Sequence, residues 1–289
     1  MPKPPTEFIE FDLYKGKCKI KFFPNSHRYT VNGKPTSGSV TSILGMYDKS
    51  GALIPWAVEL SVNYLRDKYF TIGKETYGQL TEGDFFDAEE QHTIKKAEAA
   101  TIGSAVHEWI ENYVKGQKVE MPDTKEAQIG VNAFLDWEKE NKVKFISSER
   151  AVYSRKHDFI GKMDIEAKVN GKLCMIDIKT SNGIYNTYNM QTAAYVKADE
   201  EESEKEYHGR WIIRLAKETE REYNARMQKK NSNRERKGKD PIDYPPYQVF
   251  EAKFLDDTAG NMERDFEAFL ACKVLKAFDN ATGFYASLK

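Results

Sequence analysis

A charged hairpin constrains this 289-residue chain more than any other segment. The string GKMDIEAKVNGKLCMIDIKTS covers residues 161–181 and predicts two strands joined by a tight turn at the Asn-Gly pair 170–171. Because side chains alternate along a strand, Asp177 and Lys179 must share one face. The two isoleucines that flank Asp177 take the opposite face and can enter a core.

Asp164 lies on the first strand of the same hairpin. Two converging carboxylates, from Asp164 and Asp177, can hold Mg²⁺, which prefers oxygen ligands and keeps several waters. A lysine beside such an ion can hold a water molecule or an anionic phosphate in place. These residue types are the ones that metal-assisted cleavage of a phosphodiester requires. The alternative is an ordinary surface ion pair, because acid-x-lysine spacing recurs elsewhere in this charged chain.

Hydrophobic periodicity along the chain predicts an α/β fold with a central mixed β-sheet, flanked by helices and preceded by an N-terminal β-hairpin and a helical region. Pro55 is expected in a first helical turn, and residues 71–92 are expected to be irregular. The expected strands are 144–153, 159–169, 172–179, 210–215 and 247–254, and the expected helices are 54–69, 93–114, 125–141, 184–198 and 257–278.

We expect a single domain over residues 1–289. Within it, the N-terminal hairpin is expected at 19–36, with its turn at an Asn-Gly pair, and the catalytic motifs within 93–200. A charged insert is expected at 216–246.

Composition limits the classes of function. The net charge is −1, so any affinity for nucleic acid must come from local patches. The three cysteines are far apart and lack metal-ligand spacing. The start of the chain has no signal-peptide pattern, and no apolar run approaches the roughly 18 residues that span a membrane. We therefore expect a cytoplasmic protein without a membrane partner.

One basic segment stands out from the surrounding composition. Residues 226–239, RMQKKNSNRERKGK, hold seven Lys or Arg and one acid, whereas residues 199–206 are acidic. The simplest interpretation of both segments is a solvated loop. For the basic run, the alternative is a contact with nucleic acid. The candidate substrate-binding residues there are Lys229, Lys230, Arg234 and Arg236.

Three further polar residues lie on predicted helices. His107, in TIGSAVHEWIENYV, borders an apolar stripe and shares a face with Glu111 four residues on. It is either a structural histidine at the core border or a metal ligand. Gln191 and Tyr195 are also four residues apart, on the helix that follows Lys179. They either pack on the sheet or contact a phosphate near the metal site.

Taken in order, these motifs resemble the PD-(D/E)xK nuclease superfamily, and more narrowly its RecB-type exonuclease branch. GSAVHEWIE is similar to the histidine motif of that branch, and GKMDIEA to its G-x-x-D motif. IDIKTS resembles its D-x-K-T-S motif and QTAAY its Q-x-x-x-Y motif. The N-terminal string HRYTVNGKPTSGSVTSIL, followed by ALIPWA, is similar to phage and prophage members.

The resemblance implies a restriction-endonuclease-like core and a Mg²⁺ or Mn²⁺ ion. It implies that His107, Asp164, Asp177 and the carbonyl of Ile178 bind this metal, and that Lys179 is the catalytic lysine. Gln191 and Tyr195 would meet substrate or support the site. The cysteines that hold an iron–sulfur cluster in some relatives are absent. No G-x-x-x-x-G-K-[ST] loop is present, so the chain carries no helicase motor.

The function expected from these motifs is a metal-dependent exonuclease that hydrolyses phosphodiester bonds from a DNA end. Such an enzyme would act in phage or bacterial DNA recombination, repair or degradation. A helicase or a single-strand-binding protein is a possible partner. Two alternatives are a non-catalytic DNA-binding subunit with a nuclease fold and a structure-specific endonuclease.

Overall fold

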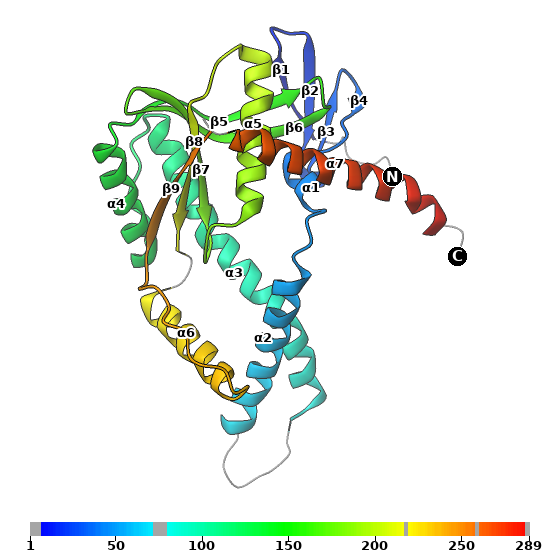
Figure 1. Cartoon of the computed structure of the whole chain (residues 1–289). Coiled ribbons are helices and arrows are strands. Elements are labelled where there is room, and N and C mark those ends of the chain that lie inside the picture. Colours follow the sequence, from blue (N-terminus) through cyan, green and yellow to red (C-terminus); the bar gives the residue numbers. More distant parts are fainter. Residues whose placement is uncertain (1–6, 72–79, 217–218, 258–259, 287–289) are drawn as a thin grey trace. The chain divides into compact units, whose positions relative to one another are not determined.

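The computed structural model describes residues 7–71, 80–216, 219–257 and 260–286 (Figure 1). The chain divides into two compact units: unit 1 comprises Met1–Met46 with Val106–Lys289, and unit 2 comprises Tyr47–Ala105. The single domain expected over 1–289 stays a prediction.

A five-stranded mixed sheet forms the centre of unit 1, as the sequence predicts. Its strands lie in the order β5-β6-β7-β8-β9. The β7–β8 pair is parallel, whereas the other neighbouring pairs are antiparallel. The strands are β5 (Lys144–Ser154), β6 (Phe159–Val169), β7 (Lys172–Thr180), β8 (Gly209–Leu215) and β9 (Phe250–Asp256).

The turn between β6 and β7 falls where the Asn-Gly pair predicts it. Asn170 and Gly171 have φ angles of 50° and 83°, the left-handed values that a two-residue hairpin turn of type I′ requires. This turn fixes the register so that Ile165 pairs with Ile176. Since register decides which face each side chain takes, the short turn sets the position of the charged residues downstream.

Helices cover both faces of the sheet (Figure 1). α5 (Asn186–Ser203) connects the parallel strands β7 and β8, and packs on one face with α1 (Val40–Leu44) and α7 (Asn261–Ala286). α4 (Lys125–Glu140) and the end of α3 (Glu82–Val114) pack on the other face. The helix predicted at 257–278 corresponds to α7, which begins and ends later than predicted.

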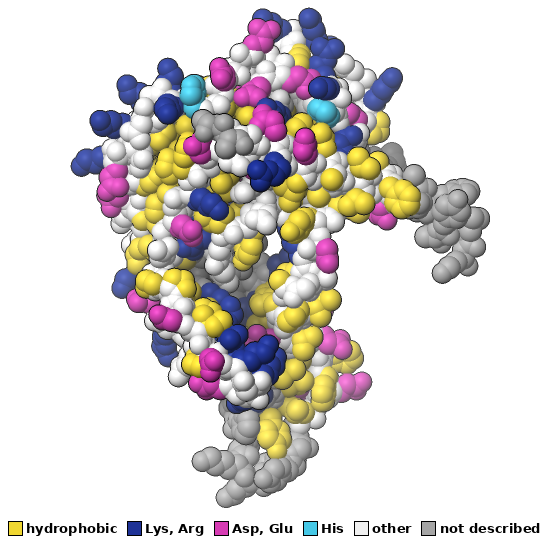
Figure 2. All heavy atoms as spheres, in the orientation of Figure 1, with side chains coloured by type: hydrophobic (Ala, Val, Ile, Leu, Met, Phe, Trp, Pro, Cys, Tyr) yellow, Lys and Arg dark blue, Asp and Glu magenta, His cyan; other side chains and the backbone are white. Residues whose placement is uncertain are grey.

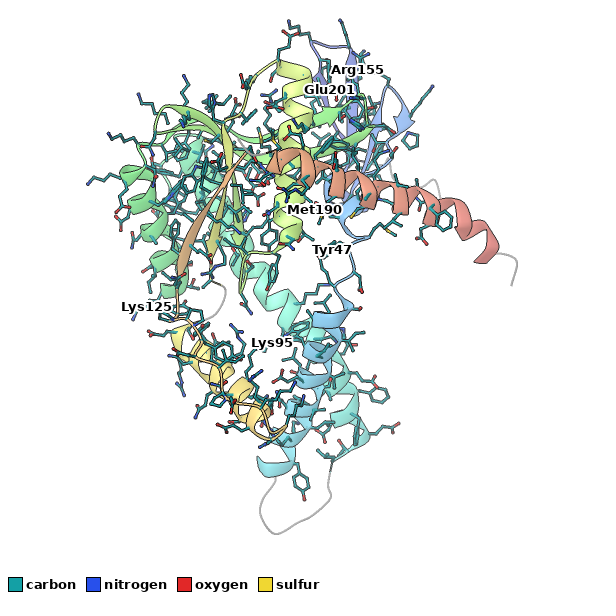
Figure 3. The ribbon with its side chains drawn as sticks, viewed as in Figure 1. Tyr47, Lys95, Lys125, Arg155, Met190 and Glu201 are labelled. Atoms are coloured by element: carbon teal, nitrogen blue, oxygen red, sulfur yellow. The ribbon has the colours of Figure 1, made fainter. Side chains whose placement is uncertain are left out.

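The far end of α5 is fixed by satisfied polar contacts. Glu201 accepts hydrogen bonds from Ser154 Oγ at 2.7 Å and from the backbone N–H of Lys156 at 2.9 Å. Figure 3 shows Glu201 and Arg155 at this end of the helix. Met190 lies in the buried part of the same helix, so α5 is anchored at one end and buried along its length.

The N-terminal part of unit 1 is a four-stranded antiparallel sheet rather than a lone hairpin. Its order is β1-β2-β3-β4, and its Asn-Gly turn joins β3 to β4. The sequence analysis missed β1 because IEFDL is an exposed edge strand with little burial. The strands are β1 (Ile9–Leu13), β2 (Cys18–Phe23), β3 (Arg28–Val31) and β4 (Lys34–Pro35), with a short 3₁₀ turn η1 (Pro24–Ser26) after β2.

Unit 2 is helical and contains α2 (Ser50–Thr71) and the first part of α3. Lys68 pairs with Asp84 at 3.0 Å across these helices. Two expectations were wrong here. Pro55 lies inside α2 instead of in its first turn, since the helix begins at Ser50. Of residues 71–92, those from position 82 onward are helical; positions 72–79 lie outside the described residues.

The basic segment 226–239 is not a solvated loop. Most of it belongs to α6 (Glu220–Glu235), whose N-terminus has a capping box between Thr219 and Glu222. Reciprocal bonds of this kind satisfy free backbone N–H groups and stabilise a helix start without apolar periodicity. The acidic segment 199–206 was also misassigned, because α5 continues through residue 203.

The outer half of α7 carries exposed apolar side chains, visible in yellow in Figure 2. They include Val274, Leu275 and Phe278. No helix among the described residues is both long and apolar enough to cross a membrane.

Candidate active site

Strand β7 lies between two neighbours and places Asp177 and Lys179 on the face covered by α5. Ile176 and Ile178 enter the opposite core, as the alternation predicts. Asp177 is fully buried, and its Oδ2 lies 2.6 Å from Lys179 Nζ. The ordinary surface ion pair considered as an alternative is therefore excluded.

Burial dominates the electrostatics of this pair. Desolvation raises the pKa of Asp177 to about 7; the Lys179 ammonium opposes this rise, and the Asp164 carboxylate adds to it. For Lys179, burial alone would lower the pKa, but the charges of Asp177 and Asp164 outweigh burial and raise it. The lysine therefore stays protonated at neutral pH, and the two carboxylates compete for its charge.

Neither carboxylate oxygen of Asp177 accepts a hydrogen bond. Lys179 Nζ approaches Oδ2 as an ion pair. Buried polar atoms are nearly always hydrogen-bonded, and each unsatisfied one needs an explanation. A buried carboxylate whose nearest cation is a single ammonium group retains the capacity to accept a further ligand.

Asp164 connects the two strands of the hairpin through its side chain. The ladder between β6 and β7 ends at the Ile165–Ile176 pair. Beyond it, the backbone N–H of Ile178 donates to Asp164 Oδ2 at 2.9 Å. This bond brings the Asp164 carboxylate beside the segment that carries Asp177 and Lys179, so the predicted convergence of the two acids is realised.

Gln191 and Tyr195 project from α5 as a connected pair. Gln191 Nε2 donates to Tyr195 Oη at 2.8 Å, and Tyr195 is buried. The ring of Tyr195 packs against the backbone of Gly161, where a Cβ would collide with it. Burial raises the pKa of the Tyr195 phenol, so it stays neutral. The Lys179 charge opposes that rise, which puts Tyr195 within electrostatic reach of the lysine.

Tyr188 also belongs to this group, although the sequence analysis did not select it. Lys179 Nζ lies 5.4 Å from the centroid of the Tyr188 ring, within the range of a cation–π contact. Tyr188, Gln191 and Tyr195 lie at positions i, i+3 and i+7 of α5. That spacing puts them on one helical face, and it is the signal that could have identified Tyr188.

His107 lies on the part of α3 that belongs to unit 1. Its neighbours Val106 and Ile110 are buried, as the apolar stripe predicts, and His107 itself is half-buried. Among the residues that the structure describes, no three His, Cys, Asp or Glu side chains form a group that could hold a metal ion. His107, Asp164 and Asp177 therefore do not form a three-residue ligand set, and the metal role of His107 stays a prediction.

A further acid, Glu149 on β5, lies near Asp164. It forms an ion pair with Lys162, and its φ of 55° is a left-handed value inside a strand. Burial raises its pKa; the lysine opposes this, and the charges of Asp164 and Glu111 add to it. The effect of Glu111 on the pKa of Glu149 shows that Glu111, one turn after His107, lies within electrostatic reach of Glu149.

Arg214 extends the site along the sheet. It pairs in register with Lys179 and donates to the carbonyl of Ser181, at the end of the Asp-x-Lys-Thr-Ser motif. A cavity of about 130 Å³ adjoins Arg214, and Tyr223 of α6 and Tyr247 help to line it. The insert that contains α6 therefore begins beside the strand ends that carry the motif.

The four basic candidates of the insert lie farther along it. Lys229, Lys230 and Arg234 are on α6, and Arg236 is its C-cap. Lys230 Nζ lies 5.7 Å from the Tyr244 ring centroid, and Arg234 Nε donates to the carbonyl of Asp240 at 2.7 Å. The structure brings none of the four into contact with Asp177. Their role in substrate binding stays a prediction.

No protein-family model matches the chain, and no curated protein matches its sequence.

Proposed function

We propose that this chain is a metal-dependent DNA exonuclease of the PD-(D/E)xK superfamily, in its RecB-type branch. In this proposal, the mixed sheet is a restriction-endonuclease-like core. The observation that carries the proposal is Asp177, a fully buried carboxylate with two unsatisfied oxygens beside Lys179. Burying an incompletely paired charge costs several kcal/mol, so this arrangement serves chemistry better than stability.

The donor set suits a divalent cation of the Mg²⁺ or Mn²⁺ type. Mg²⁺ is commonly held by one or two carboxylates while waters and substrate phosphate complete its shell. Asp177 supplies a carboxylate whose oxygens accept no hydrogen bond, and Asp164 supplies a second carboxylate next to Ile178. When bound there, such an ion would supply positive charge to polarise a phosphoryl oxygen and lower the pKa of water.

The side chains of the chain itself have separable tasks. Lys179, whose pKa is raised, remains an ammonium ion and stabilises negative charge on a phosphate or positions a water molecule. It is therefore not a general base at neutral pH. Gln191 orients the Tyr195 hydroxyl, and both can touch a phosphate. In the reaction, water adds to phosphorus, the bond to the leaving oxygen breaks, and that oxygen takes up a proton.

The preference for DNA ends rests on the resemblance to end-processing exonucleases. The same resemblance favours a role in phage or bacterial DNA recombination, repair or degradation, in the cytoplasm of a bacterial host. A helicase or a single-strand-binding protein fits as a partner, because the chain lacks a helicase motor of its own.

The proposal is tested with end-labelled linear DNA and covalently closed circular DNA, each incubated with Mg²⁺, Mn²⁺ or EDTA. We expect both cations to support degradation of the linear forms, EDTA to stop it, and closed circles to resist. Rapid nicking of closed circles would move the protein to the endonucleases. DNA binding without cleavage in either cation would favour a non-catalytic subunit.

A further inference from the structure

A cavity of about 700 Å³ adjoins the N-terminal sheet. It lies entirely within unit 1 and has no part in the Asp177 site. This volume is in the range of small-molecule pockets and exceeds what one phosphate group needs. It is lined by Phe23, Ser26, His27, Arg28, Tyr29, Thr30, Pro35, Thr36, Ser37, Gly38, Ser39, Ser42, Lys276 and Asn280.

The lining of this cavity is basic and rich in hydroxyl groups. Arg28 and Lys276 supply fixed positive charge, and His27 can add a third. The lining contains no aspartate or glutamate. Within the described part of the chain, neither Arg28 nor Lys276 forms an ion pair. The neighbouring Asp158 carboxylate is occupied by the backbone N–H and the hydroxyl of Ser37. The Arg28 guanidinium and the Lys276 ammonium, neither of them in an ion pair, favour an anion between them.

Lys276 is held over the cavity by a specific contact. Its Nζ donates to Ser42 Oγ at 2.6 Å, which joins α7 to α1. Gly38 makes this approach possible: a Cβ there would lie 2.8 Å from both Lys276 Nζ and Ser42 Oγ. Its φ of 149° is also a conformation that favours glycine. Burial lowers the pKa of the Lys276 ammonium group by desolvation.

We infer that this cavity is a second binding site, which takes the phosphate of a nucleotide. Arg28 and Lys276 hold the phosphate oxygens. Further hydrogen bonds come from lining hydroxyls other than those of Ser37 and Ser42, which already donate within the chain. The remaining volume accommodates a sugar and base, and the aromatic residues Phe23 and Tyr29 line the same space. The nucleotide is either free or one unit of a DNA strand, and both present the same chemistry.

The position of the cavity is compatible with either source. The carbonyl of Gly38 accepts a hydrogen bond from the backbone N–H of Ile160 at 3.2 Å, so the cavity wall is joined to β6. Asp164 lies four residues farther along that strand. At the rise per residue of a β-strand, this corresponds to about 13 Å from Ile160. A strand bound at the cavity could therefore reach the Asp177 site, but the cavity's affinity for phosphate does not depend on cleavage.

The test is equilibrium binding to the full chain in EDTA, in an Asp177→Ala background that prevents cleavage. The probes are deoxyadenosine monophosphate, deoxyadenosine and a fluorescent 12-nucleotide deoxythymidine strand without terminal phosphates. We expect Arg28→Gln and Lys276→Gln each to weaken binding of a phosphate-bearing probe roughly tenfold, the loss of one charge-assisted contact. Binding of the monophosphate identifies a free nucleotide, and binding of the strand alone identifies DNA.

The matched control is Lys34→Gln, which removes an exposed lysine from β4 outside the cavity. It should change affinity less than twofold, and melting temperatures should verify that all three variants fold. The inference is overturned if neither phosphate-bearing probe binds, if deoxyadenosine binds as tightly as its monophosphate, or if both cavity variants match Lys34→Gln. Because no step requires cleavage, a failed nuclease assignment would leave this result intact.

Discussion

Two buried charged residues on the same sheet, Arg210 and Asp177, differ in whether their polar atoms are hydrogen-bonded. Arg210 on β8 is fully buried, and all its donor nitrogens are bonded. Its Nε and Nη2 donate to Asp257, and Nη2 also donates to Asp265 at 2.8 Å. Its Nη1 donates to the carbonyl of Asn189 and to Thr192 Oγ1.

Asp177, one strand away, is equally buried but has neither oxygen hydrogen-bonded. A satisfied buried charge ties elements together, and here Arg210 joins β8 to α5 and to the start of α7. An unsatisfied one costs free energy unless something else binds it. The comparison therefore separates a charge retained for structure from one retained for function, although both lie in the same sheet.

The largest effect expected from this comparison is on activity. Asp177→Ala removes a proposed metal ligand, and Lys179→Ala removes the ammonium group proposed to stabilise charge on the phosphate, so each should lower the rate of DNA cleavage by at least about a thousandfold. Folding and DNA binding should survive, and removal of the Asp177 charge should ease phosphate approach. The measurement is cleavage of end-labelled DNA by purified variants. Near-wild-type cleavage by folded Asp177→Ala would reject the nuclease proposal.

The next largest expected effect is on stability, and it concerns Arg210. Arg210→Met leaves Asp257 and Asp265 without their cation and should cost about 3–5 kcal/mol of unfolding free energy. Asp177→Asn keeps the side-chain shape. It breaks the ionic contact with Lys179 but relieves the desolvation of a buried carboxylate, so it should cost less than about 1 kcal/mol. Urea denaturation of both variants measures the difference. Equal losses would show that Asp177 is as structural as Arg210.

The buried carboxylate of Asp177 should also make the stability of the chain depend on pH. Burial raises the pKa of Asp177 to about 7 in the folded chain, against an ordinary value of 3.8 for an aspartate. Between these values the folded state retains a proton that the unfolded state has lost, so stability falls as pH rises. In EDTA, the wild type should therefore lose stability relative to Asp177→Asn from about pH 4 to pH 7, then level off. Denaturation curves that stay parallel across this range would contradict the raised pKa.

The metal dependence of a His107 variant would show whether the site extends to α3. If its imidazole is a ligand, Mn²⁺ should support at least as much activity as Mg²⁺, which prefers oxygen. His107→Ala should then weaken Mn²⁺ affinity with little change in melting temperature in metal-free buffer. A large metal-free loss of stability, with unchanged metal dependence, would make His107 a structural residue at the core border.

The smallest effect concerns the basic residues of α6 and its C-cap. If they contact phosphates, replacing Lys229, Lys230, Arg234 and Arg236 with glutamine should flatten the dependence of DNA affinity on salt. The slope of log affinity against log salt should change by about 0.7 per lost contact on a single strand. Turnover of bound DNA should persist, because the Asp177 site is untouched. An unaltered slope would limit these residues to a solvated helical surface.

Much of the fold could be predicted because its signals are local. The Asn-Gly turn at 170–171 fixed the hairpin, and alternation placed Asp177 and Lys179 on one face. α6 was missed because its charged sequence has no apolar stripe. Its remaining signal, the Thr219–Glu222 capping box, was present in the sequence but was not used. Pro55 was misplaced because a proline does not by itself show how far a helix extends before it.

The site was predictable in its residue types but not in its energetics. Spacing identified the candidates, yet the burial of Asp177 depends on α5, which packs over the sheet from outside the hairpin. The bond from the Ile178 N–H to Asp164 depends on where the β6–β7 ladder ends. Tyr188 needed the observed contact with Lys179 to be recognised. These features arise from tertiary packing, which no short motif encodes.

The most direct test of the account is a calorimetric titration of the full chain with Mn²⁺ in the absence of DNA. We expect saturable binding to the wild type that is lost in Asp177→Asn. The control Asp136→Asn removes an exposed carboxylate on α4 and should bind as the wild type does. Equal Mn²⁺ binding by the wild type and Asp177→Asn, or no binding by the wild type, would contradict the claim that the free oxygens of Asp177 are reserved for a metal ion.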